Sequence, residues 1–400
     1  MLLGWILATA ALPATPSDDA ALRARISRSD LHYDAPAPRS EEGQPLGNGR
    51  MGTLVWTTPQ ALRFQINRDD IYPMSSRSTS FFERHGDYCG GAAFLDVDLG
   101  GDVWGAPAFA QHLAVYDGVM TVRGNGVTVR LLAWNAQDVI ALEVDDRREK
   151  PQPIQVSLRM LRVAQPYFGD ELEQQVKDHV VTVKTLEHTA ASRLHVDGDT
   201  IGLTQQFREA EHHDASAVAA RVVGRAARAS IPHESEVRLV VPPARGKLVI
   251  LVGSAASFEA NEDVLAGTRR AIDAAAAKGY AALARENAEW WHAFWERGSV
   301  ELTSADGSAE YVQENYHYFL YLMAASSRGR FPAKFNGMLW NTGGDLRAWG
   351  SQHWFANLSC YYEALPATNR PELLQPMFDM YGGAIEAYAA AARQQWGSAS

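Results

Sequence analysis

The chain has 400 residues, of which 46% are hydrophobic, and this is enough apolar material for a large core distributed over two or three domains. The formal net charge is −10, and without any basic cluster this balance argues against nucleic acid as a partner. The chain has two cysteines, Cys89 and Cys360, far apart in the sequence, which excludes a disulfide framework.

The N-terminus combines a short apolar run, MLLGWIL, with the small-residue pattern Ala8-Thr9-Ala10, which suits signal cleavage. The run is too short to span a bilayer, and no other stretch of the sequence could span one. We therefore expect residues 1–29 to be a signal peptide and a disordered lead-in, the protein to be secreted or periplasmic, and no membrane partner. The alternative is an ordinary disordered N-terminus, because no Lys or Arg precedes the apolar run.

The stretch from Gly47 to Gly52 fits the dinucleotide pattern G-x-G-x-x-G. That pattern binds a pyrophosphate only between a strand and a helix, whereas here prolines precede it and alternating, strand-like residues follow. Asn48-Gly49 is a strong signal for a tight turn. The segment is therefore predicted to be a turn that leads into a strand, and no nucleotide or other cofactor is expected.

Residues 30–257 are predicted to form an antiparallel β-super-sandwich. Their apolar segments alternate or run continuously, Gly and Asp turn signals separate them, and no helix-period segment interrupts them. This argues against a parallel sheet, and the number of strands favours an extended two-sheet sandwich. The clearest strand segments are residues 93–99, 127–134, 139–144, 154–161, 180–186 and 247–253.

The composition changes to Ala-rich, helix-forming sequence after the strands. We expect one helix over residues 262–295, a second over 310–326 and a third helical region over 371–396. We therefore divide the chain after residue 257 into a helical linker at 258–304 and a helical domain at 305–400.

An aromatic stretch at residues 331–363 mixes tryptophans with amides, an imidazole and carboxylates, and glycines break it into a loop. Aromatic faces beside polar groups are what a sugar site needs, so a carbohydrate is the expected substrate. The alternative is a buried aromatic seam between helices. The predicted substrate-binding residues are Trp340, Asn341, Trp349, His353, Trp354 and Glu363.

Other site chemistries have little support in the sequence. The run from Glu211 to Asp214 contains two histidines, but it is interpreted as a solvated β-loop rather than a metal site, and no HExxH motif occurs. No G-x-S-x-G elbow supports a serine nucleophile. No metal site is expected.

Four segments together resemble glycoside hydrolase family 95, the α-L-fucosidase and α-L-galactosidase family. They are PLGNGRMGTLVW, QINRDDIY, WWHAFWERGSVEL, and the run from FNGMLWN to WGSQHWFANLSCYYEALPATN. The resemblance implies an N-terminal super-sandwich, a helical linker and an (α/α)6 barrel that carries the catalytic site. It also implies inverting hydrolysis of a terminal α-linked sugar from glycans or plant polysaccharide.

The same resemblance assigns one catalytic residue. The family holds its attacking water with two asparagines, and the second falls on Asn357, while Phe355 stands in place of the first. No carboxylate of the aromatic stretch stands where the family has its general acid or base. We therefore expect both groups beyond Ser400, an incomplete barrel, and a 400-residue chain that is inactive alone. A non-catalytic carbohydrate-binding protein and a disaccharide phosphorylase are the alternatives.

Overall fold

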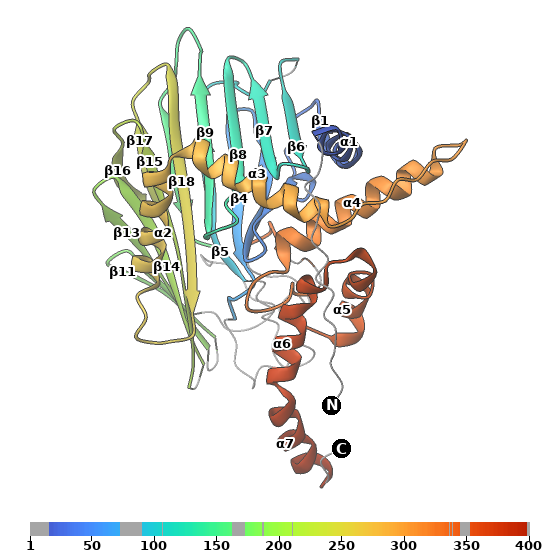
Figure 1. The fold of residues 1–400 in the computed structure, drawn as a ribbon. Helices are drawn as coiled ribbons and strands as arrows, with labels where there is room; N and C mark the ends of the chain where they lie inside the picture. Colours follow the sequence, from blue (N-terminus) through green and yellow to red (C-terminus); the bar gives the residue numbers. More distant parts are fainter. Residues whose placement is uncertain are drawn as a thin grey trace.

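The computed structural model describes residues 16–72, 90–105, 107–161, 173–185, 188–209, 211–335, 337, 339–344 and 353–397. Two large sheets dominate these residues, and their strand pairs are antiparallel (Figure 1). The antiparallel pairing expected from the alternating pattern is therefore confirmed, and each of the clearest predicted strand segments overlaps one of these strands.

The larger sheet has eleven strands and the smaller has seven. In spatial order the larger sheet contains β1 (Leu31–Tyr33), β6 (Ala110–Ala114), β7 (Val119–Gly124), β8 (Val127–Ala133), β9 (Val139–Asp146), β18 (Gly246–Ser257), β15 (His212–Val223), β14 (Thr200–Glu209), β13 (His188–Asp197), β12 (Val180–Thr185) and β11 (Glu173–Lys177). The smaller contains β16 (Arg228–His233), β17 (Glu236–Val241), β10 (Ile154–Arg159), β5 (Gly91–Asp98), β4 (Ala61–Arg68), β3 (Met51–Thr57) and β2 (Gln44–Gly47).

The helices follow the strands in the chain, apart from one at the start. They are α1 (Pro16–Ile26), α2 (Val264–Lys278), α3 (Tyr280–Glu296), α4 (Ser308–Ser326), α5 (Phe355–Tyr362), α6 (Gln375–Gly383) and α7 (Ile385–Trp396), with 3-10 turns η1 (Ser27–Ser29), η2 (Ser40–Glu42), η3 (Pro366–Thr368) and η4 (Pro371–Leu374). Among the described residues, none of the helices is long and apolar enough to cross a membrane.

The helices differ from the sequence-based expectation in two places. Residues 262–295 form two helices rather than one, because Gly279 lies between them at φ +77°, a conformation that ends a helix and that glycine adopts without steric cost. Helix α1 lies inside the segment expected to be a disordered lead-in. It is held by an ion pair of 2.9 Å between Arg23 and Asp117, and by a hydrogen bond from Tyr116 to Asp19.

Helix α2 lies over the outer face of the larger sheet, and α3 follows it (Figure 1). A smaller apolar cluster there contains Ile272 and Leu283, both fully buried, and burial of such a side chain stabilises by about 1.5–3 kcal/mol. Gly253 permits this approach, since a Cβ there would lie 2.9 Å from Ile272 Cγ1.

The main core lies between the two sheets and continues into the helices. Its buried members include Phe64 and Val97 of the smaller sheet, Leu142 of the larger, and Trp291 and Tyr321 from α3 and α4. The rings of Trp291 and Tyr321 stack with centroids 4.9 Å apart. Because this one apolar cluster includes residues of both sheets and of α3 and α4, these two helices pack directly onto the sandwich.

Candidate functional site

The aromatic stretch is fastened to the smaller sheet by two buried amides of β4. Asn67 Nδ2 donates to the carbonyl oxygens of Leu339 and Asn341, at 2.9 Å each. Gln65 donates from Nε2 to the carbonyl of Gly344 at 2.5 Å and accepts from its N–H at 2.8 Å. A side-chain amide has both donor and acceptor atoms, so these two residues pair the loop backbone as a neighbouring strand would. Residues 339–344 are therefore held on the sandwich.

The glycine-rich turn at residues 47–52 also contributes to the contact between the 339–344 loop and the sandwich. Gly47 pairs with Gly52, and Asn48 N–H donates to Met51 O at 3.1 Å, so the predicted turn into a strand is confirmed. A Cβ on Gly52 would lie 3.0 Å from Trp340 Cζ3. The glycines therefore give the Trp340 indole room to pack over the hairpin.

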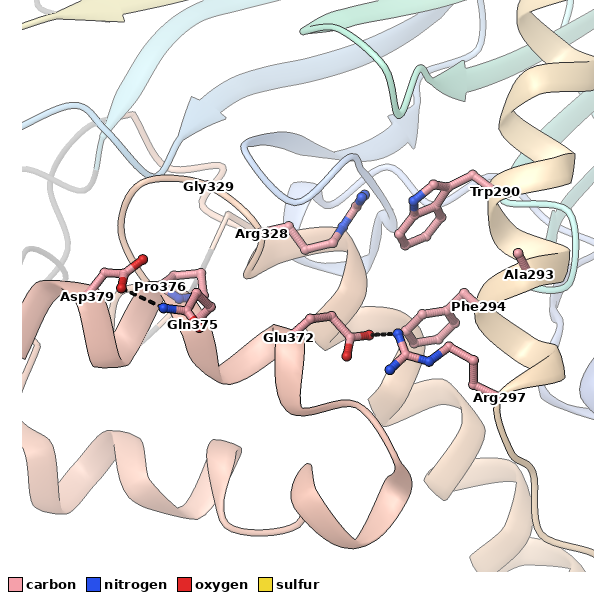
Figure 2. Close-up of a pocket in the computed structure, with 10 residues that line it drawn as sticks. All are labelled: Trp290, Ala293, Phe294, Arg297, Arg328, Gly329, Glu372, Gln375, Pro376 and Asp379. Atoms are coloured by element: carbon pink, nitrogen blue, oxygen red, sulfur yellow. Dashed lines mark hydrogen bonds and ion pairs between the residues drawn. The ribbon is translucent and has the colours of Figure 1, made fainter. Parts of the chain in front are cut away.

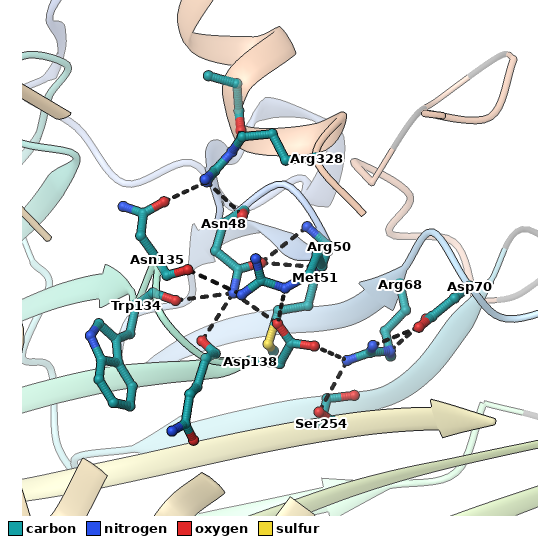
Figure 3. A network of polar contacts seen from close by, with 12 residues as sticks. Asn48, Arg50, Met51, Arg68, Asp70, Trp134, Asn135, Asp138, Ser254 and Arg328 are labelled. Carbon is teal, nitrogen blue, oxygen red and sulfur yellow. Dashed lines mark hydrogen bonds and ion pairs between the residues drawn. The ribbon is translucent and has the colours of Figure 1, made fainter. Parts of the chain in front are cut away.

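A polar network joins this turn to the end of α4 (Figure 3). Asp138 accepts from Arg50 Nε at 2.6 Å and from Arg68 Nη1 at 3.0 Å. Burial works against ionisation of Asp138, but the charges of Arg68 and Arg50 outweigh it and hold the pKa of this carboxyl below its usual value. Asn48 donates to Asp138 Oδ1 at 3.2 Å, and Arg328 donates to the Asn48 carbonyl at 2.5 Å. The network thus links both sheets to the helices.

A second set of contacts surrounds Tyr72, just after β4. Its hydroxyl lies 2.5 Å from His353 Nε2, and Lys334 Nζ lies 4.1 Å from the centre of its ring while donating to Ile71 O at 2.5 Å. We call Tyr72, Lys334 and His353 the Tyr72 cluster. Burial, with a contribution from the Lys334 charge, lowers the pKa of His353 to about 3, and burial raises the pKa of Tyr72 well above its usual value. His353 is therefore neutral at pH 7 and can accept the hydrogen bond of the tyrosine.

Asp69 is a buried carboxyl that lies in the chain between Arg68 of the polar network and Tyr72 of the Tyr72 cluster. It is 1% exposed, and neither carboxylate oxygen has a hydrogen-bond partner among the residues that the structure describes. Burial, and then the negative charge of Asp70, raise the pKa of Asp69 well above its usual value. A Cβ on Gly329 would overlap the Asp69 carboxylate, so this group lies directly behind that glycine. A raised pKa is the property that a carboxyl needs to act as a general acid.

Gly329 also lines a cleft of about 410 Å³ (Figure 2). One wall comes from α3 and carries aromatic rings, and the other comes from η4 and α6 and carries carboxylates and an amide. The lining residues are Trp290, Ala293, Phe294, Arg297, Arg328, Gly329, Glu372, Gln375, Pro376 and Asp379.

The side chains of the cleft are paired across and along its walls. Arg297 Nη1 lies 2.5 Å from Glu372 Oε1, and Gln375 Nε2 donates to Asp379 Oδ1 at 2.6 Å. Trp290 stacks on Phe294, with ring centroids 5.5 Å apart. An aromatic wall opposite carboxylate and amide groups suits a ligand that has C–H faces and a rim of hydroxyls.

The predicted site residues divide into two groups. Trp340 and Asn341 lie in the loop held on the sandwich, where Asn341 is buried, and His353 belongs to the Tyr72 cluster. Trp354 caps the start of α5, with its ring 5.6 Å from that of Phe335. The structure therefore brings Trp340, Asn341 and His353 against the sandwich.

Two others, Asn357 and Glu363, lie apart from that contact. Asn357 lies in the first turn of α5 and Glu363 lies at its C-terminal end, and both are exposed. Trp349 lies outside the described residues. Of the predicted residues that the structure describes, none lines the cleft.

One sequence interpretation is wrong. The run from Glu211 to Asp214 is not the solvated loop that the sequence predicts, because His212 and Asp214 belong to strand β15 and Asp214 is fully buried. Asp214 Oδ2 accepts from Tyr72 N–H at 2.5 Å, and His212 Nε2 lies 2.6 Å from Tyr72 O. Both side chains pair with backbone groups of the segment after β4, and for Asp214 this contact compensates burial.

Sequence reasoning also missed Gln65, Asn67 and Asp69. The available signal was the segment QINRDDIY, in which Gln65 and Asn67 are spaced by two and so share one face of a strand.

No family model matches this sequence, and no curated protein matches it either. Among solved structures, a putative kojibiose phosphorylase from the human microbiome superposes with a TM-score of 0.51 and 12% identity, over 78% of this chain and 44% of that one. A family GH92 α-mannosidase from Bacteroides thetaiotaomicron gives a TM-score of 0.38 at 8% identity, over 78% of this chain and 41% of that one. The chain thus spans less than half the length of these proteins, and it shares its fold with the putative phosphorylase.

Proposed function

We propose that this chain is part of an enzyme that cleaves the α-glycosidic bond of a saccharide. The observation that carries the proposal is the fold that it shares with the putative kojibiose phosphorylase over 78% of its length. The cleft supports it, because it combines the half-buried indole of Trp290 with Glu372 and Asp379, which offer acceptors to the hydroxyls of a sugar.

The finer proposal is an exported hydrolase of the α-L-fucosidase type that acts with inversion on a terminal α-linked sugar. It rests on the segments that resemble family 95 and on the apolar run at the N-terminus. We propose a sandwich at 30–257, a linker at 258–304 and the start of an (α/α)6 barrel at 305–400. Asn357 is the proposed water-holding residue, and its exposed position on α5 leaves it accessible to a ligand.

A phosphorylase is the second candidate, because the structure with the shared fold is named as one. The cleft also contains Arg297, a cation that could contact phosphate if its ion pair with Glu372 opened. The two candidates differ in product, since hydrolysis releases the free sugar and phosphorolysis releases a sugar 1-phosphate.

Saccharide binding by the chain is the direct test, because it does not depend on which groups act as general acid and general base. Calorimetric titration with L-fucose, L-galactose, D-glucose and their aryl α-glycosides should detect binding. Trp290→Ala should weaken it by roughly 2- to 10-fold, the loss expected for one aromatic contact. Trp396→Ala is the matched control, since Trp396 is 74% exposed on α7.

A second variant, Asp379→Asn, changes an exposed side chain of the cleft and leaves the core untouched. It should weaken saccharide binding without lowering the melting temperature. If no sugar of the panel binds, or if both cleft variants bind as the wild-type chain does, the cleft is not a saccharide site. Product analysis with and without inorganic phosphate, on any form that turns over substrate, separates the hydrolase from the phosphorylase.

A further inference from the structure

Two histidines face each other at one edge of the larger sheet. Strand β1 is the terminal strand in the sheet order and pairs with β6 in antiparallel register, with His32 directly opposite His112. Residues that are directly opposite in an antiparallel pair project from the same face of the sheet. The two rings are stacked, with centroids 4.2 Å apart and planes 10° apart. The sheet register therefore places two imidazoles side by side.

A carboxylate completes the group. Asp30 comes just before β1, and its side chain is 7% exposed. Its Oδ1 accepts from the backbone N–H of Val115 at 2.8 Å, and its Oδ2 lies 2.9 Å from His112 Nε2. One ligand atom each from Asp30, His32 and His112 lies within 4.8 Å of the others. The backbone contact fixes the carboxylate and leaves its second oxygen directed at the imidazoles.

We propose that Asp30, His32 and His112 bind one divalent transition-metal ion of the Zn²⁺ class. Two imidazole nitrogens and one carboxylate oxygen form a ligand set that suits such an ion and not Mg²⁺ or Ca²⁺, which prefer oxygen ligands alone. Ligand atoms around one zinc ion lie roughly 3–4 Å apart, because each metal–ligand bond is about 2.0–2.2 Å. His32 is exposed, so a rotation of its ring closes the site without moving the core.

The hydrogen bond from Val115 N–H to Asp30 and the exposure of the site support this assignment. Val115 N–H orients the ligating carboxylate, a role that outer-shell groups have in metal sites. The His112 side chain is 37% exposed, so the ion would be reached from solvent and would keep at least one position for water. This site is separate from the cleft, since none of its three residues lines that cavity.

The consequence is structural. Strand β1 has only three residues and pairs on one side with β6, so its attachment to the sheet is short. A metal ion held by ligands on both strands would cross-link this edge and bind the folded form in preference to the unfolded one. The melting temperature should therefore rise when Zn²⁺ is added to the protein.

The experiment uses untagged, chelator-treated protein and ZnCl₂ alone. Calorimetric titration should give one tight site, Co²⁺ should produce the visible absorption of a site with nitrogen ligands, and the melting temperature should rise by several degrees. His32→Ala changes an exposed residue, so the variant should fold, yet it should lose all three signals. His233→Ala is the matched control, because His233 is an exposed strand histidine whose Nδ1 contacts Ser235.

Asp30→Asn is the second variant, because it keeps the size of the side chain and removes the negative charge. It should weaken Zn²⁺ binding by at least 10-fold, since even the loss of an outer-shell contact costs a metal site roughly 10- to 100-fold in affinity. The proposal is overturned if wild-type protein takes up no stoichiometric Zn²⁺ in equilibrium dialysis. It is equally overturned if His32→Ala binds the ion as the His233→Ala control does, because another of the chain's histidines would then hold it.

Discussion

Replacing Asn67 by alanine should release the aromatic stretch from the sandwich. The Asn67 side chain is fully buried, and its Nδ2 donates to Leu339 O and Asn341 O at 2.9 Å each. The substitution leaves two buried carbonyl groups without their donor. At about 1–3 kcal/mol for each unsatisfied group, the loss is roughly 2–6 kcal/mol, and entry of water would keep it in the lower half of that range.

Two measurements check this expectation. Urea unfolding followed by tryptophan fluorescence should give a lower midpoint for Asn67→Ala than for the wild-type chain. Hydrogen–deuterium exchange of residues 339–344 should become faster, because the loss is concentrated where the loop meets β4. The matched control is Asn315→Ala, which removes an exposed amide on α4 whose Nδ2 donates to Tyr311 O at 2.8 Å, and which should change stability by no more than about 0.5 kcal/mol.

The outcome that refutes the reasoning is specific. If Asn67→Ala unfolds at the same urea concentration as Asn315→Ala, and residues 339–344 exchange at the wild-type rate, the buried amide does not hold the loop. Faster exchange throughout the sheet with no local excess would instead assign Asn67 to the general stability of β4.

Three further predictions follow from single positions. Gly49→Ala should lower the melting temperature more than Gly198→Ala, because both glycines have positive φ but only at Gly49 would the Cβ meet another side chain, 2.5 Å from Arg328 Cβ; equal losses would contradict this. His353→Gln should flatten the pH dependence of stability. The pKa of His353 is lowered to about 3 in the folded chain, against about 6.5 in the unfolded chain. The contribution of the neutral imidazole to the free energy of unfolding is therefore full above pH 6.5 and is lost as the pH falls toward 3. Urea midpoints measured across that window check the sign, and an unchanged slope would refute it. Phe378→Ser should reduce binding of the dye ANS, since Phe378 is 57% exposed on α6, and undiminished fluorescence would show that the dye binds elsewhere.

Local pattern was enough to predict several features of this protein. The change of hydrophobic period from near 2 to near 3.6 placed the boundary between strands and helices, and β18 ends at Ser257 while α2 begins at Val264. Asn48-Gly49 identified the turn between β2 and β3 from two residues. These features depend on neighbours in the chain, so the sequence alone contains them.

The composition of the candidate site depended on contacts between distant segments, and only the tertiary structure decided it. The sequence singled out His353 and Asn341, but not that His353 meets Tyr72 or that Asn341 is bound by Asn67. Nor could it indicate that Asp69 is buried and has no hydrogen-bond partner among the described residues, because an aspartate beside an arginine in a sequence suggests a solvated pair. Periodicity reports which face of an element is apolar, and it contains no information about which other element covers that face. That choice is made by packing, when strands and helices hundreds of residues apart exclude water together.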